Sequence, residues 1–209
     1  MGMEDSFEGL DEANTDRVKR TFAALVARGI APFFTRTRQL ALSKVLEMIP
    51  KGASVAHGSS TTLEQIGFIE RVNNPASGYR YLNAEWRDES DPVKRNRLRG
   101  RLSVEADFFL GSVQALAETG EAVAADAGGS RQAFYVYGPS RVIWVAGINK
   151  LVPTAADGLR RVREIALPLE DQRMRAAGAK GSYIGKLVIY ERERPGRISL
   201  ILVGERLGF

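Results

Sequence analysis

The chain of 209 residues has no cysteine and one histidine, and its 30 Lys and Arg side chains exceed its 25 Asp and Glu side chains to give a formal net charge of +5. The absence of cysteine excludes disulfide frameworks, thiolate zinc sites and cysteine nucleophiles, and a single histidine excludes multi-histidine metal sites, so we expect no bound metal. Because the sequence has no run of about 18 apolar residues and its N-terminus is acidic, it predicts a soluble cytoplasmic protein with no membrane partner.

From residue 15 onward, helical and strand patterns alternate, which predicts a single α/β domain over residues 15–209. Residues 1–14 are acidic and polar and predict a flexible N-terminal arm. In chain order, the first half predicts a helix over 18–26 that Gly29 ends, a strand over 30–35, a helix over 40–49, a buried strand over 53–56, a helix whose first turn holds Thr61 and Thr62, a strand over 79–83, and a helix that starts at Pro92 after Asp91.

The second half is richer in strands. Thr119 and Gly120 are typical of a tight turn and predict a hairpin, and Pro168 is expected to stop or redirect the last helix. In chain order, this half predicts strands over 107–112, 115–118, 121–125 and 141–146, a helix over 154–166, and strands over 186–190 and 198–203. We therefore expect a mainly parallel sheet that the late strands make mixed, with helices flanking it.

The turn after the strand at 53–56 is the first candidate site. It joins a strand to a helix, so small residues allow a ligand to come close, while hydroxyls and the N–H groups of the first helical turn donate hydrogen bonds. Such a turn is suited to a phosphate, a carboxylate or a developing oxyanion, although it matches neither the Walker A nor the dinucleotide-binding pattern. The alternative is an ordinary helix N-cap, with Glu64 completing a capping box to Thr61 and His57 as a structural residue. Its ligand-binding candidates are Gly58, Ser59, Ser60, Thr61 and Thr62.

Carboxylates near strand ends form a second candidate cluster. Glu105, Asp107 and Glu118 are candidate nucleophiles or general bases, because carboxylates at the carboxyl edge of an α/β sheet can do acid–base or nucleophilic work. The alternatives place Glu118 on a solvated hairpin and treat the adjacent Gly-rich stretch as a turn. The ligand-binding candidates in that stretch are Asp126, Gly129 and Arg131.

A third candidate follows the buried strand RVIWVA directly. Here Gly147, Asn149 and Lys150 place an amide and an ammonium at a strand end, where they can orient an anionic ligand. The alternative is a strand-to-loop turn with an exposed lysine.

Basic side chains are concentrated in residues 94–101, on the helix that starts at Pro92. This segment lacks interleaved aromatic residues, and on a helix its charges spread around the axis, so we expect a solvated face. Since the other arginines are scattered among acidic residues, we expect no nucleic-acid partner.

The three candidate segments, in this order, resemble the LUD domain, the family of the lactate-utilisation protein C. The resemblance lies in IPKGASVAHGSSTTLEQIG, ADFFLGSVQALAETGEAVAADAGGSRQA, YGPSRVIWVAGINKLV, DGLRRVREIALP and GRISLILVGERLGF, which extend from about residue 40 to 209. It implies a Rossmann-like fold similar to the NagB, ribose-5-phosphate isomerase and CoA-transferase group, with the ligand at the strand ends. In that group, the Gly/Ser/Thr turn after an early strand holds a phosphate or a carboxylate.

The chain departs from the family pattern in several places. Ser112-Val113-Gln114-Ala115 replaces the usual Ser-x-Asn-Ala, and Gly129-Ser130-Arg131 replaces Gly-Asn-Arg. Residues 175–187 replace a segment in which many similar proteins carry cysteines, so a metal or redox role tied to those cysteines cannot operate in this protein.

The resemblance implies a protein that binds a small anionic metabolite and assists the use of lactate or related 2-hydroxy acids, with iron–sulfur lactate-oxidation proteins as partners. Two alternatives stay open. The first is an acyl- or CoA-transferase-like or sugar-phosphate isomerase-like enzyme, with Glu105, Asp107 or Glu118 as nucleophile or base. The second is a non-catalytic interaction subunit of an iron–sulfur lactate-oxidation complex that contacts its partner through the basic segment at 94–101.

Overall fold

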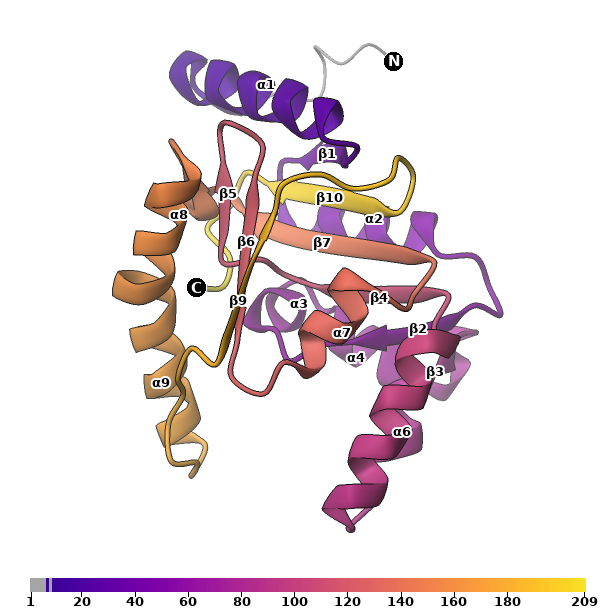
Figure 1. The fold of residues 1–209 in the computed structure, drawn as a ribbon. Coiled ribbons are helices and arrows are strands. Elements are labelled where there is room, and N and C mark those ends of the chain that lie inside the picture. Colours follow the sequence, from indigo (N-terminus) through magenta and orange to yellow (C-terminus); the bar gives the residue numbers. More distant parts are fainter. Residues whose placement is uncertain (1–6, 8) are drawn as a thin grey trace.

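The structure is a computed structural model that describes residue 7 and residues 9–209. Its central feature is a sheet of six parallel strands in the order β1-β10-β7-β4-β2-β3 (Figure 1). These strands are β1 (Ala31–Thr35), β2 (Ser54–His57), β3 (Arg80–Tyr81), β4 (Phe108–Gly111), β7 (Arg141–Gly147) and β10 (Ile198–Val203). Because all six run in the same direction, their carboxyl ends meet at one edge, which is where open α/β sheets bind ligands.

Helices bury both faces of this sheet, as parallel sheets require. Along β7, Val142, Trp144 and Ala146 pack on one face, while Ile143 and Val145 pack on the other. The first face is covered by α1 (Glu12–Ala27), α5 (Leu82–Arg87), α6 (Pro92–Glu105) and α7 (Ser130–Val136). The second face is covered by α2 (Arg38–Met48), α3 (Thr61–Gln65) and α4 (Phe68–Asn73).

A second sheet of four strands, in the order β8-β5-β6-β9, packs beside the first. Its strands β5 (Ala115–Ala117) and β6 (Ala122–Asp126) form an antiparallel hairpin, β9 (Lys186–Tyr190) pairs antiparallel with β6, and β8 (Leu151–Val152) pairs parallel with β5. Tyr190 lies edge-on to Trp144 with 5.0 Å between ring centroids, so the two sheets share one core. A helical rod beside the second sheet is formed by α8 (Ala155–Arg161), a π-helical turn (Val162–Ala166) and α9 (Leu167–Ala176) (Figure 1).

The predicted α/β class, with a mainly parallel sheet and flanking helices, is confirmed. The strands divide between two sheets more sharply than we expected. β10 joins the parallel sheet, whereas β9 pairs with the hairpin strand β6, so the antiparallel pairs are confined to the second sheet. The hairpin around Thr119 and Gly120 forms as expected.

The helix does not stop at Pro168, which was one of the two outcomes expected there, because the helical rod continues past it. Pro168 stands in the first turn of α9, which restarts after the π-helical turn, and a proline is tolerated at such a start. The strand expected over 79–83 is limited to Arg80–Tyr81, since α5 begins at Leu82. No helix of the described residues is long and apolar enough to cross a membrane.

The expected arm over residues 1–14 overlaps the first helix. Asp11 caps α1, its Oδ1 accepting a hydrogen bond from Asn14 N at 2.8 Å, so residues 12–14 already form the first helical turn. Residues 1–6 and 8 of the expected arm lie outside the described residues.

Candidate functional site

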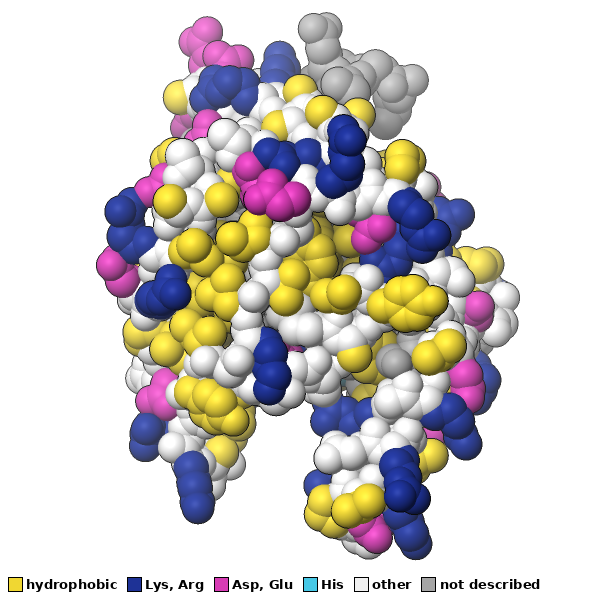
Figure 2. Space-filling view, viewed as in Figure 1, with side chains coloured by type: hydrophobic (Ala, Val, Ile, Leu, Met, Phe, Trp, Pro, Cys, Tyr) yellow, Lys and Arg dark blue, Asp and Glu magenta, His cyan; other side chains and the backbone are white. Residues whose placement is uncertain are grey.

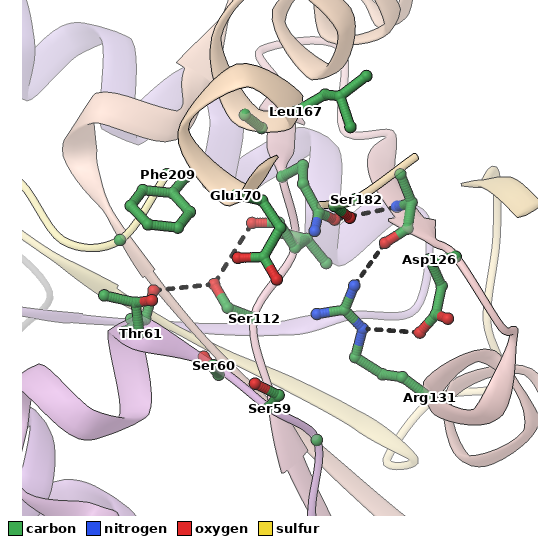
Figure 3. Close-up of a pocket in the computed structure, with 18 of the residues that line it drawn as sticks. Ser59, Ser60, Thr61, Ser112, Asp126, Arg131, Leu167, Glu170, Ser182 and Phe209 are labelled. Atoms are coloured by element: carbon green, nitrogen blue, oxygen red, sulfur yellow. Dashed lines mark hydrogen bonds and ion pairs between the residues drawn. The ribbon is translucent and has the colours of Figure 1, made fainter. Parts of the chain in front are cut away.

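A cavity of about 390 Å³ lies at the carboxyl ends of β2 and β4, beneath α9 (Figure 3). Segments far apart in the sequence line it: the turn after β2, the residues after β4, the Gly-rich turn after β6 and the lysine after β7. The structure therefore brings parts of all three predicted clusters to one place. The predicted residues that line the cavity are Gly58, Ser59, Ser60, Thr61, Thr62, Asp126, Arg131 and Lys150.

Lys150 is the most deeply buried charged side chain of this cavity, with 3% of its surface exposed. Its Nζ donates to Ser112 Oγ at 2.8 Å and to Thr62 Oγ1 at 3.2 Å, and neither partner carries a charge. Burial lowers the pKa of the Lys150 ammonium well below its usual value, and the guanidinium groups of Arg161 and Arg131 lower it further. The alternative interpretation, a turn with an exposed lysine, is therefore wrong for Lys150.

The turn after β2 presents hydroxyls to the same cavity. Ser60, and not Thr61, caps α3, because its Oγ accepts a hydrogen bond from Leu63 N at 3.3 Å. Glu64 is exposed and does not complete a capping box to Thr61. Since α3 has only 5 residues, its dipole is small, and most of the positive charge at the site comes from side chains.

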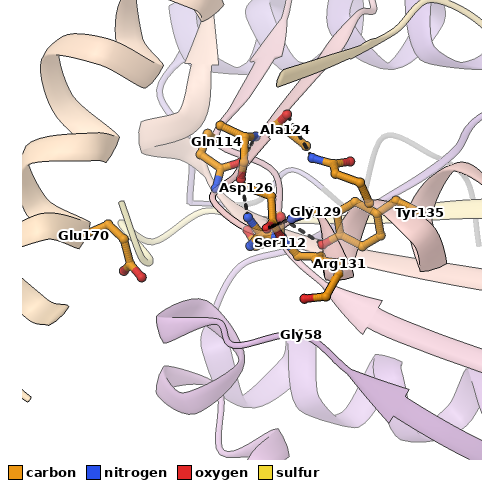
Figure 4. Close-up of polar contacts among 12 residues, drawn as sticks. Gly58, Ser112, Gln114, Ala124, Asp126, Gly129, Arg131, Tyr135 and Glu170 are labelled. Carbon is orange, nitrogen blue, oxygen red and sulfur yellow. Dashed lines mark hydrogen bonds and ion pairs between the residues drawn. The ribbon is translucent and has the colours of Figure 1, made fainter. Parts of the chain in front are cut away.

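Arg131 and Asp126 line the cavity across from Thr61 (Figure 3), and Figure 4 shows the two side chains close to Gly129. Arg131 Nε lies 3.5 Å from Asp126 Oδ2, and Arg131 Nη2 donates to a backbone carbonyl of β6. Gly129 is outside the lining, but its N–H donates to Asp126 Oδ1 at 2.6 Å and so holds that carboxylate in place. A Cβ on Gly58 would lie 2.9 Å from Cδ of Arg131, so glycine allows the arginine to pass over the turn.

His57 lines the cavity, but both of its ring nitrogens are engaged. Nδ1 lies 3.0 Å from the carbonyl oxygen of Gly58, and Nε2 lies 2.7 Å from the hydroxyl of Tyr81. A carbonyl can only accept, so Nδ1 carries the proton and Nε2 accepts from Tyr81. Burial also lowers the pKa of His57, which favours the neutral ring. This geometry favours His57 as a structural residue.

Gly147 and Asn149 lie beside the cavity and not in its lining. Asn149 Oδ1 accepts from Leu207 N at 2.9 Å, and its Nδ2 donates to the carbonyl of Gly208 at 3.4 Å. A Cβ on Gly147 would meet this Asn149 side chain. Gly208 and Phe209 line the cavity, so these hydrogen bonds of Asn149 hold a lining segment in place.

The three candidate carboxylates Glu105, Asp107 and Glu118 do not line the cavity. Asp107 precedes β4 and therefore stands at the amino end of the strand, where its Oδ2 accepts from the hydroxyl and the N–H of Ser54 at 2.7 and 2.8 Å. These hydrogen bonds lower the pKa of Asp107. Glu105 ends α6, and Glu118 forms an ion pair with Arg17 of α1 at 2.6 Å.

Many lining residues were not among the sequence candidates, and four of them place polar or charged groups beside the predicted ones. Ser112 directly follows β4, so the strand-end argument used for His57 and Lys150 could have found it. Arg99 belongs to the basic segment that we expected to be solvated, yet it lines the cavity, and its Nη2 donates to Ser130 Oγ at 2.5 Å. No sequence signal separates Arg99 from the other arginines of α6. The remaining two residues are Glu170 and Arg173 of α9, which form an ion pair at 2.6 Å.

The comparisons with known proteins concern the whole fold. A family model described as the LUD domain matches residues 18–203. The chain is similar to a DUF162-family protein from Deinococcus radiodurans, whose crystal structure superposes with a TM-score of 0.54 at 14% sequence identity, over 93% of this chain and 100% of that one. At this identity, the likeness shows the fold alone. The comparison with curated proteins found no match.

Proposed function

The chain belongs to the LUD-domain family, and from this premise and the chemistry of its cavity we propose that it binds a small anionic metabolite, a carboxylate or a phosphate, against Lys150. Lys150 is the observation that carries the proposal, because its amine is buried with only hydroxyl partners. A buried ammonium that lacks a countercharge is costly, and an anionic ligand supplies that countercharge. The hydroxyls of Ser112 and Thr62 are then in reach of the same ligand.

The charges around the cavity support an anion in preference to a cation. The two lining carboxylates each face a lining arginine, so these charges largely cancel. Lys150 and Arg99 have no carboxylate partner in an ion pair among the described residues. The remaining charge at the site is therefore positive, from Arg99 and, when it is protonated, from Lys150.

The use of this binding is inferred from the family. We propose that the anion is lactate or a related 2-hydroxy acid and that the chain assists its oxidation in the cytoplasm beside iron–sulfur proteins. The enzyme alternative, with Glu105, Asp107 or Glu118 as nucleophile or base, has less support, because these carboxylates stand away from the cavity. The alternative of a non-catalytic interaction subunit is compatible with the outward side of α6, where Lys94 and Arg97 are exposed and could contact a partner.

Isothermal titration with lactate, pyruvate and inorganic phosphate tests the proposed binding. We expect at least one of these anions to bind the wild-type protein and Lys150→Met to weaken that binding by about tenfold or more, since a hydrogen bond to a charged group contributes roughly 1.5–3 kcal/mol. Lys180→Met, at an exposed position outside the cavity, is the matched control and should bind like the wild type. No heat with any of the three anions, or equal affinities for the two lysine variants, would contradict the proposal.

A further inference from the structure

The cavity is much larger than a three-carbon acid. Its volume of about 390 Å³ falls within the range of roughly 300–1,000 Å³ that drug-sized ligands occupy. A lactate ion held at Lys150 would leave most of this space to water. The cavity therefore has room for a ligand with a substantial part beyond its anionic group.

One wall of this space is the face of α9 that carries two apolar side chains beside the Glu170–Arg173 ion pair. Leu167 and Met174 line the cavity with Glu170 between them, at the i, i+3, i+7 spacing that places side chains on one side of a helix. Leu167 and Met174 are half-buried, and neither belongs to a hydrophobic core cluster of the described residues. Figure 2 shows the surface hollowed between the projection that carries α9 and the projection that carries α6, with hydrophobic side chains gathered on the α9 side.

Aromatic side chains contribute the other apolar surface. Trp86 of α5 lines the cavity and is half-buried, with the guanidinium of Arg99 5.9 Å from its ring centroid. Phe109 and Phe134, which are stacked with 4.2 Å between ring centroids, also line the cavity but are only 1% and 3% exposed, so the open aromatic surface is mainly that of Trp86. Flat aromatic surfaces of this kind are suited to a ring or a branched alkyl group.

We propose that the ligand is an anion that carries a ring-sized apolar body, which lies between Leu167 and Met174 of α9 and the aromatic surface that includes Trp86. This proposal rests on the proposed function, because the anionic group is held at Lys150. Lactate then binds more weakly than a related 2-hydroxy acid with such a body, since it occupies only the space beside Lys150. Burial of a group the size of a phenyl ring increases affinity by roughly tenfold to a hundredfold.

Two matched pairs of probes test the proposal: lactate with 3-phenyllactate, and inorganic phosphate with phenyl phosphate. We expect the phenyl member of at least one pair to bind about tenfold or more tightly than its small partner in calorimetry. The same titration should change the fluorescence of Trp86, because the other of the 2 tryptophans, Trp144, is fully buried and outside the cavity. Trp86→Phe should remove the fluorescence change while calorimetry still detects binding.

Two variants of α9 distinguish the loss of an apolar contact with the ligand from a general effect on folding. Leu167→Asn should reduce the affinity for the phenyl probe by about tenfold and leave the affinity for the small anion unchanged. Leu169→Asn, at an exposed position of α9 that does not line the cavity, should change neither affinity.

Three results would overturn the proposal. The first is equal affinity for the two members of both pairs, which would leave simple anion binding standing. The second is an equal effect of Leu167→Asn and Leu169→Asn on the phenyl probe. The third is binding of the neutral probe 3-phenylpropanol as tightly as 3-phenyllactate, since the anionic group would then be unnecessary. If no probe binds, the proposed function itself fails.

Discussion

The buried ammonium of Lys150 has no negatively charged partner among the described residues. Its Nζ faces two hydroxyls, and the charged groups that act on it, Arg161 and Arg131, are cations. The folded state therefore disfavours the ammonium form. In the unfolded chain the same side chain is solvated and titrates near its usual pKa of about 10.4.

This difference gives stability a pH dependence with a definite sign. Between the lowered folded-state pKa of Lys150 and about 10.4, the unfolded chain binds more protons, so stability rises with pH. We expect the free energy of unfolding of the wild type, measured relative to Lys150→Met, to rise by up to about 1.4 kcal/mol per pH unit as the pH increases toward about 10.

Urea denaturation of both proteins at a series of pH values measures this difference. The wild type measured against Lys180→Met is the control and should show no such trend, because that side chain is exposed. A difference between the wild type and Lys150→Met that stays constant with pH would mean that Lys150 keeps its usual pKa.

At the residue scale, a candidate at the carboxyl end of a strand of the parallel sheet lies in or beside the cavity, whereas one that precedes such a strand lies away from it. Lys150 follows β7 and lines the cavity, whereas Asp107 precedes β4 and stands at the opposite end of its strand. Strand direction can be deduced from sequence, so this distinction was available. Arg99 was not predictable, because the side of α6 that turns inward depends on how the helix packs against the rest of the fold.

Among the elements, β4 and α7 together hold Ser112 beneath the cavity. Gly111 ends β4, and a Cβ there would overlap the hydroxyl of Tyr135 in α7. That hydroxyl donates to the carbonyl of Ser112 at 2.9 Å, and Tyr135 is itself fully buried against Trp144. The backbone beside Lys150 is therefore fixed by a contact that only a glycine at position 111 permits.

Gly111→Ala should accordingly destabilise the protein by about 1–3 kcal/mol, because overpacking displaces Tyr135 or the end of β4. Gly128→Ala is the matched control, since a Cβ there would have no neighbour within 4 Å, and its effect should stay within about 0.5 kcal/mol. Chemical denaturation of the two variants measures both values. Equal stability of the two would show that the approach of Tyr135 to Gly111 is not required.

Helix length was harder to deduce than helix position. α3 starts where the sequence predicts but contains only 5 residues, so the expected role of its dipole passes largely to Lys150. The rod formed by α8 and α9 continues through Pro168. A π-helical turn directly precedes α9, so the proline stands in the first turn of a new helix and not in a helix interior. Local propensities do not report such tertiary adjustments.

For the whole molecule, alternation of helices and strands was enough to predict the α/β class. The division into two sheets was not, because the choice of β9 to pair with β6 depends on packing between residues distant in sequence. This division shapes the cavity, since Lys150 lies at the edge of the parallel sheet while α9 extends from α8 and the π-helical turn, which pack on the second sheet. A ligand with an anionic group at Lys150 and an apolar body against α9 would contact both sides of this cavity.

A crystal structure of the protein with the tighter binding of 3-phenyllactate and phenyl phosphate tests the central claim most directly. We expect the anionic group within hydrogen-bond distance of Lys150 Nζ and Ser112 Oγ, and the ring between Leu167 and Trp86. A ligand bound at another surface, or in the cavity with its anionic group away from Lys150, would contradict the assignment of Lys150 as the anion-binding residue.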